Sequence, residues 1–77
     1  MYEGKEYKQY IAEKTVLYAI KRFVNKYGYP PTFRELTSIC DFNSTSTTSR
    51  YLNILKSKGF IDYKPKIPRS IRIIKND

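Results

Sequence analysis

The sequence predicts a small α+β domain, mainly α, with three helices followed by a C-terminal two-stranded β-hairpin. Three stretches carry apolar residues at the three- and four-residue spacing of an amphipathic helix. Two short runs then alternate apolar and polar residues, as strands do, on either side of a proline-bounded turn. The 77 residues have room for one domain, spanning 1–77, with one modest core.

Composition and charge narrow the classes of function. Apolar residues make up 40% of the chain and aromatic residues 16%, which is enough for a packed fold. The formal net charge is +8, which favours an acidic partner, and nucleic acid is the commonest one for a small basic domain. One cysteine, Cys40, and no histidine exclude an internal disulfide, zinc-finger spacing and histidine general-base chemistry.

Patterns typical of enzymes and membrane proteins are missing from the sequence. The carboxylates are scattered, and the three glycines form no phosphate-binding loop. No apolar run reaches membrane-spanning length, and the first residues do not have the shape of a signal peptide. We therefore expect a protein that is not an enzyme, that uses no cofactor, metal or membrane, and that is cytoplasmic. The expected setting is the nucleoid of a bacterial or phage-type host.

The first helix is predicted over about residues 5–27, after a frayed N-terminus at residues 1–5. Gly28 ends this helix, and the following Tyr29-Pro30-Pro31 segment enforces an extended connection. The expected apolar face comprises Val16 or Leu17, Ile20, Phe23 or Val24, and Tyr27.

A capping box marks the start of the second helix at Phe33. Thr32 can accept a hydrogen bond from the Glu35 N–H, while the Glu35 side chain reaches back to the Thr32 N–H. A tight turn is predicted at residues 41–43, with Phe42 inserted between helices. The expected buried face of the helix comprises Leu36, Ile39 and Cys40.

The third helix is the stretch around which the chain is organised. Ser44 is the predicted N-cap, because its hydroxyl can accept from the free backbone N–H groups one turn on, and Asn43 could take that role instead. Gly59 is expected to end the helix in a left-handed conformation. The first turn and a half is unusual because it holds only Ser and Thr residues before Arg50, although hydroxyl side chains are poor helix formers. Such a start suits contact with phosphates and base edges, and a merely soluble helix start is the alternative. The expected apolar face comprises Thr48, Leu52 and Leu55.

Two helices joined by so short a turn predict a helix-turn-helix at residues 33–58. The strand-like runs 60–64 and 69–75 follow, separated by a segment with prolines at both ends, and they predict a wing at residues 60–75. An isolated hairpin is marginal in water, so this one must pack on the helices. The residues expected to do so are Phe60, Ile61, Ile71 and Ile73.

Four segments, taken in order, resemble the N-terminal DNA-binding domain of LexA repressors: residues 28–36, 42–44, 52–61 and 69–73. The similarity covers about residues 15–74, and its most specific features are the Pro-Pro-Thr helix start, the Lys-Gly-apolar-Ile junction and the Arg-x-Ile-Arg strand. It implies a winged helix-turn-helix and a sequence-specific regulator of transcription, of the repressor kind, that binds double-stranded DNA. The third helix would enter the major groove and the wing would touch the backbone.

Two departures from the family modify these expectations. LexA proteins continue into a self-cleaving peptidase domain that also holds the dimer together, and this chain ends at Asp77 without one, so switching by self-cleavage is not expected. The family's recognition helix usually begins with a Ser-Pro-Asn-type turn and carries acidic or amide side chains. Because Thr45, Ser46, Ser49 and Arg50 occupy those places here, we expect a different target sequence.

The predicted DNA contacts come from the starts of the second and third helices and from the wing. Arg50 is expected to pair with a guanine edge, with a solvated arginine as the alternative. The other residues of the predicted set are expected to contact phosphates or bases. The simpler alternatives for them are helix capping, solvent exposure or a solvated turn. The set is Thr32, Arg34, Ser44, Thr45, Ser46, Thr47, Ser49, Arg50, Lys64, Lys66 and Arg69.

Two other functions remain open from the residues alone. The first is a protein-interaction module or inhibitor of a regulator that reuses the winged-helix shape and docks a protein partner through Tyr7, Tyr10 and Ile11. The second is single-strand binding through the basic wing and the tyrosines. A weak homodimer on DNA is also left open, since one domain of this size covers one half-site.

Overall fold

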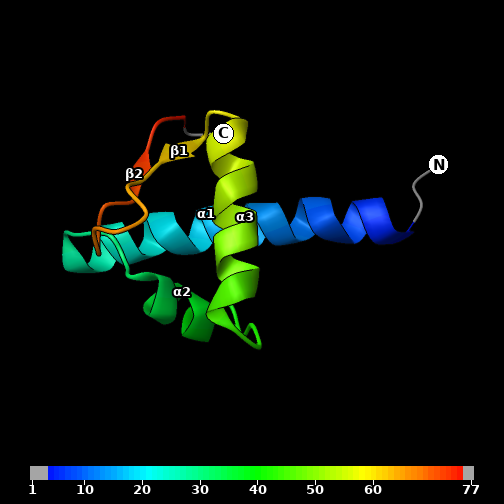
Figure 1. The fold of residues 1–77 in the computed structure, drawn as a ribbon, viewed down its shortest axis with the longest axis horizontal. Coiled ribbons are helices and arrows are strands. Elements are labelled where there is room, and N and C mark those ends of the chain that lie inside the picture. The colour runs from blue at the N-terminus through cyan, green and yellow to red at the C-terminus, as the bar shows by residue number, and fades with distance from the viewer. Residues whose placement is uncertain (1–3, 76–77) are drawn as a thin grey trace.

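Three helices and two short strands follow one another in the computed structural model, which describes residues 4–75. The chain runs α1 and α2, then α3, which lies across α1, and finally the small sheet (Figure 1). This arrangement confirms the predicted α+β winged-helix fold. Over the described residues, no helix combines the length and the apolar character needed to cross a membrane. The bounds are α1 Gly4–Tyr27, α2 Phe33–Ile39, α3 Thr45–Ser57, β1 Ile61–Asp62 and β2 Arg72–Ile73.

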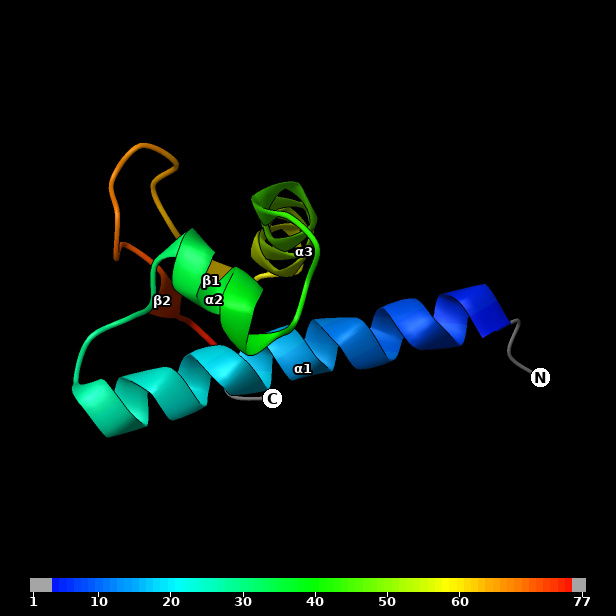
Figure 2. The same cartoon turned by 90° about the horizontal axis from the view of Figure 1, so that it is seen from below.

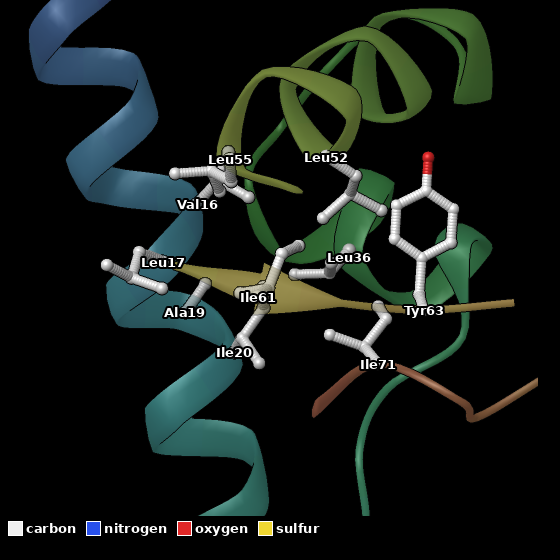
Figure 3. Close-up of a cluster of buried hydrophobic side chains, with 10 residues drawn as sticks. All are labelled: Val16, Leu17, Ala19, Ile20, Leu36, Leu52, Leu55, Ile61, Tyr63 and Ile71. Atoms are coloured by element: carbon white, nitrogen blue, oxygen red, sulfur yellow. The ribbon is translucent and has the colours of Figure 1, made fainter. Parts of the chain in front are cut away.

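The core lies where the three helices meet the sheet, and every element supplies or flanks part of it (Figure 3). The predicted buried face of α3 is confirmed, because Thr48, Leu52 and Leu55 are all buried. The wing packs on the helices as expected, with Phe60 and Ile73 half-buried against the core. The buried apolar side chains are Val16, Leu17, Ala19, Ile20, Leu36, Leu52, Leu55, Ile61, Tyr63 and Ile71.

Two side chains expected in the core lie outside it. Ile39 is 51% exposed, because α2 has only seven residues and its last one lies where the chain turns away from the core. Tyr27 is 48% exposed in the last turn of α1. Its ring packs instead on Phe23, with centroids 4.5 Å apart, and on Tyr29, at 6.0 Å. The predicted fraying at residues 1–5 falls partly outside the described residues, within which α1 begins at Gly4.

Hydrogen bonds between neighbouring residues define both ends of α2. The predicted capping box is present: the Glu35 N–H donates to Thr32 Oγ1 at 3.1 Å, and the Thr32 N–H donates to Glu35 Oε1 at 2.9 Å. At the other end Asp41 adopts a left-handed conformation with φ 59°, and the Phe42 N–H donates to the Thr37 carbonyl at 3.0 Å. This Schellman motif makes the sharp turn between α2 and α3.

The same motif ends α3. Gly59 has φ 82°, as predicted, and the Phe60 N–H donates to the Leu55 carbonyl at 3.0 Å. The turn directs the chain from the end of α3 into β1, so Ile61 enters the core immediately after the helix. The wing is therefore anchored to the same helix whose tip it flanks.

The strands of the wing are shorter than predicted. The antiparallel pair joins only Ile61 to Ile73 and Asp62 to Arg72, where runs over 60–64 and 69–75 were expected. A side chain replaces the backbone ladder beyond this point: the Ser70 hydroxyl accepts from the Lys64 N–H at 2.9 Å and donates to the Lys64 carbonyl at 3.0 Å. The loop closes through this hydroxyl rather than through further strand pairing.

Candidate nucleic-acid interface

Both α3 and the wing loop project on the side of the molecule opposite α1 (Figure 2). The buried residues of α3 fix its rotation about its own axis, with Thr48 and Leu52 turned inward. Residues three and four positions apart share a helix face, so Ser46, Arg50 and Asn53 line the outward face, and all three are exposed. A polar ridge therefore runs along α3 away from the core.

The hydroxyl groups at the start of α3 do not cap the helix and are exposed or half-buried. Ser44 occupies the N-cap position, but its side chain makes no capping hydrogen bond, which corrects the predicted role of its hydroxyl. Ser44, Thr45 and Ser46 are exposed, while Thr47 and Ser49 are half-buried on the flanks. These short polar side chains are available to a partner that approaches the tip of the helix.

Thr48 belongs to the core rather than to this surface. Its side chain is fully buried, and its Oγ1 lies 2.5 Å from Thr37 Oγ1. The Thr37 hydroxyl already donates to the Phe33 carbonyl at 2.7 Å, so Thr48 must be the donor in the pair. The run of hydroxyl residues therefore has two tasks, because one of its members ties α3 to α2.

Arg50 extends from the outward face beside an aromatic stack. Its guanidinium carbon lies 5.6 Å from the centroid of the Tyr51 ring, and that ring stacks on Phe42 with centroids 5.4 Å apart. Among residues 10–75, whose side chains the structure describes, no carboxylate lies within ion-pair distance of Arg50. The guanidinium thus lies within cation–π distance of the Tyr51 ring, and Arg50 remains exposed.

A hollow brings together predicted residues from three separate segments. It has a volume of about 460 Å³ and lies between the start of α2, the start of α3 and the wing loop. Thr32 and Arg34 contribute from the first, Thr45 from the second and Lys66 from the third. Arg34 and Lys66 are both exposed, so the hollow has a cationic rim.

Arg69 lies apart from the hollow's lining and is held by the protein itself. Its Nη1 donates to Glu35 Oε1 at 2.9 Å and to the Pro30 carbonyl at 3.1 Å, and its Nη2 donates to Glu35 Oε2 at 2.9 Å. The guanidinium also lies over the Tyr29 ring, 4.6 Å from its centroid. The hydrogen bonds between the two side chains lower the pKa of the Glu35 carboxyl and raise the pKa of the Arg69 guanidinium.

The neighbouring wing carboxylate is also paired. Asp62 lies 3.5 Å from Lys56 Nζ and 3.6 Å from the Arg72 guanidinium. The Tyr63 N–H bond, followed by Lys56 and Arg72, lowers the pKa of Asp62. Because these cations partly neutralise the acidic groups of the wing, the exposed Lys64 and Lys66 keep the side facing outward positive.

Sequence reasoning missed one residue of this surface and one buried residue that contacts it. Asn53 continues the outward face of α3 beyond Arg50, and its three-residue spacing from Arg50 is the signal that could have found it. Tyr63 was assigned to a strand, but its hydroxyl donates to Asn53 Oδ1 at 2.5 Å. No sequence signal joins these two residues, since the contact depends on where the wing packs.

The thiol of Cys40 and the possible metal ligands were the remaining candidates for chemistry in the described part of the chain. Burial raises the pKa of the half-buried Cys40 thiol, which suits a packed side chain rather than a reactive one. Within the part of the chain that the structure describes, no group of three or more potential ligands could hold a metal ion.

Comparison with known proteins gives one consistent match. The model of the LexA DNA binding domain matches residues 11–70. The chain is 40% identical over 77 residues to the LexA repressor of Alkaliphilus oremlandii, an alignment covering all of this chain and 35% of the relative. It is 37% identical over 62 residues to that of Carboxydothermus hydrogenoformans, covering 80% and 30%, and 41% identical over 61 residues to that of Lactiplantibacillus plantarum, covering 79% and 29%. The chain thus spans about a third of the length of these curated relatives.

Proposed function

Because this chain belongs to the LexA DNA binding domain family, we propose that it is a sequence-specific transcription repressor that binds double-stranded DNA. The observation that carries the proposal is the outward polar face of α3, which begins with exposed hydroxyl side chains and bears the exposed Arg50. Among the described side chains of residues 10–75, no carboxylate forms an ion pair with this arginine. A major groove about 12 Å wide admits a helix of this kind. We further propose that the protein acts without enzymatic chemistry, in the cytoplasm, where it reaches the nucleoid.

The tip of α3 would supply the base contacts. Arg50 presents a two-pronged donor that matches the O6 and N7 acceptors of guanine. Thr47 offers a hydroxyl and a methyl group to a base edge or to a thymine methyl, and Ser49 reaches a neighbouring base. Ser44 and Ser46 would bind the phosphates that flank the entry point.

The hollow beside α3 would receive the DNA backbone. Arg34 and Lys66 bring positive charge to its rim, while Thr32 and Thr45 bring short polar side chains from two helix starts. Lys64 adds charge on the wing. Contacts of this kind position a protein on the duplex and make its affinity depend on salt, without selecting sequence.

Arg69 would contribute in two ways. Three of its five N–H donors are used within the protein, toward Glu35 and the Pro30 carbonyl. The remaining donors are free to meet a phosphate, so the predicted DNA contact and the structural contact are compatible. The larger role proposed for Arg69 is to hold the wing in place.

Direct binding measurements test the proposal. Sequences selected from a random duplex library would be labelled, and their affinity measured by fluorescence anisotropy over a range of salt concentrations. We expect an enriched motif and an affinity that falls steeply with salt, because phosphate contacts release counterions. A palindromic motif would indicate that two copies bind as a weak dimer.

Failure to enrich any duplex at low salt would overturn the proposal. Single-stranded competitors at equal nucleotide concentration form the second arm of the measurement. Tighter binding to single strands would favour the single-strand alternative. Capture of a protein that depends on Tyr10 and Ile11, with no DNA binding, would favour the docking module.

A further inference from the structure

The outward face of α3 carries an asparagine whose side-chain amide is held in one orientation by a buried tyrosine. Asn53 is exposed and lies three residues beyond Arg50 on the same helix face. The Tyr63 hydroxyl donates to its Oδ1 at 2.5 Å. The oxygen of the amide is therefore turned toward the protein, and its nitrogen is turned away from Tyr63.

Tyr63 is itself held rigidly by the core. Only 5% of its surface is exposed, and its ring meets Phe33 edge to face with centroids 5.4 Å apart. Lys56 Nζ lies 4.8 Å from the ring centroid and also donates to the Tyr63 carbonyl at 3.1 Å. The tyrosine lies among the buried side chains beneath α3, with its hydroxyl oxygen at the outer end (Figure 3). A hydroxyl on so firmly packed a ring cannot follow a moving partner, so it sets the orientation of Asn53.

The resulting surface group is a donor. An asparagine amide normally offers one acceptor and two N–H donors, and here the acceptor already has a partner. Toward the side chains that the structure describes, those of residues 10–75, the Asn53 Nδ2 makes no hydrogen bond. A freely rotating asparagine pairs with adenine by accepting from N6 and donating to N7, and the bond to Tyr63 works against that pairing.

Building on the proposed function, we infer that Asn53 reads guanine at one position of the DNA target and that Tyr63 positions it. Guanine presents two adjacent major-groove acceptors, N7 and O6, to which an outward amide nitrogen can donate. Cytosine presents an N4 donor and is disfavoured. The readout lies one helical turn along α3 from the base contacted by Arg50, because the two side chains are three residues apart.

Selection from a random duplex library tests this inference. The wild-type protein is compared with three variants at the two residues and with one control variant. N53A should lower the guanine preference at one position roughly fivefold and leave the rest of the motif unchanged. Y63F keeps the ring but frees the amide to rotate, so adenine should become accepted at the same position. N53D offers a carboxylate acceptor, so cytosine should replace guanine there.

The matched control is Y18F, which removes a tyrosine hydroxyl from the exposed face of α1 and should leave the motif unchanged. Circular dichroism of each variant checks that the fold is retained. A motif unaltered by both N53A and Y63F would overturn the inference while leaving the proposed function intact. If the wild-type protein enriches no motif at all, it is the proposed function that fails.

Discussion

Arg69 and Glu35 are 34 positions apart in the chain, and they meet in two parallel hydrogen bonds of 2.9 Å. Glu35 already closes the capping box of α2 through its Oε1, so one carboxylate serves both the start of that helix and the wing. The two-pronged geometry is the one that guanidinium and carboxylate groups favour. This contact ties the wing loop to the start of α2 by polar bonds, in addition to the apolar packing of Ile61, Tyr63 and Ile71 in the core.

Removing the guanidinium should loosen the wing and lower the stability of the domain. We expect the urea midpoint of unfolding to fall in the order wild type, R69K, R69A, because lysine keeps the charge but loses the fork. R69G is the matched control, since it also removes the guanidinium but relieves the left-handed backbone at φ 57°. Equal midpoints for wild type and R69A would show that the pair contributes nothing.

Acid should weaken the same link. Hydrogen bonding to Arg69 lowers the pKa of Glu35 below its ordinary value of 4.5, so the unfolded chain takes up this proton at a higher pH than the folded one. The contribution is complete above that value and is lost as the pH falls through the folded pKa. Unfolding midpoints measured from neutral pH to below 4.5 should decline less steeply for E35Q. Parallel decline in both proteins would contradict this assignment. D62N controls for the second lowered carboxyl.

The buried hydroxyl pair between α2 and α3 should stabilise the fold, and a double-mutant cycle measures its interaction energy. T48V keeps the shape of the fully buried side chain but leaves Thr37 Oγ1 without its donor, which should cost about 1 kcal/mol of unfolding free energy. T37V, T48V and the double variant complete the cycle. We expect the double variant to cost less than the sum of the single ones, because no polar atom is then left unpaired. Strict additivity would show that the hydroxyls do not interact.

Alanine substitutions at Arg50 and Lys66 should distinguish a base contact from a phosphate contact. R50A is expected to lose roughly 1–3 kcal/mol of discrimination at one base position, with little change in the salt dependence of non-specific binding. K66A is expected to weaken all duplexes about equally and to reduce the salt slope by about 1. Anisotropy titrations against the selected site and single-base variants of it distinguish these outcomes. Uniform weakening by R50A would place Arg50 on the backbone instead.

Local sequence patterns predicted the helices well because the groups that define them are close together in the chain. The capping box needs only Thr32 and Glu35, and the end of α3 needs only the left-handed Gly59. The spacing of Thr48, Leu52 and Leu55 likewise gave the correct buried face. Each of these features depends on residues within about two helical turns.

Contacts across the fold could not be read in the same way. Glu35 had a complete explanation as a capping residue, so nothing in the sequence pointed to its second partner, Arg69. The bond from Tyr63 to Asn53 joins a wing residue to a helix through tertiary packing alone. The DNA contacts assigned to the tip of α3 and to the wing stay predictions that the binding measurements above will test.

The brevity of β1 and β2 sets the order in which the molecule should come apart. Two residue pairs protect few amides, whereas Leu52 and Leu55 lie at the centre of the core. In native-state hydrogen exchange the amides of Asp62 and Ile74, the latter bonded to the Phe60 carbonyl at 2.8 Å, should therefore exchange through a sub-global opening that leaves the helices folded. If the wing opens locally while the helices stay folded, it could adjust to variations in the width of the DNA groove. The position of α3 in the major groove would then stay unchanged.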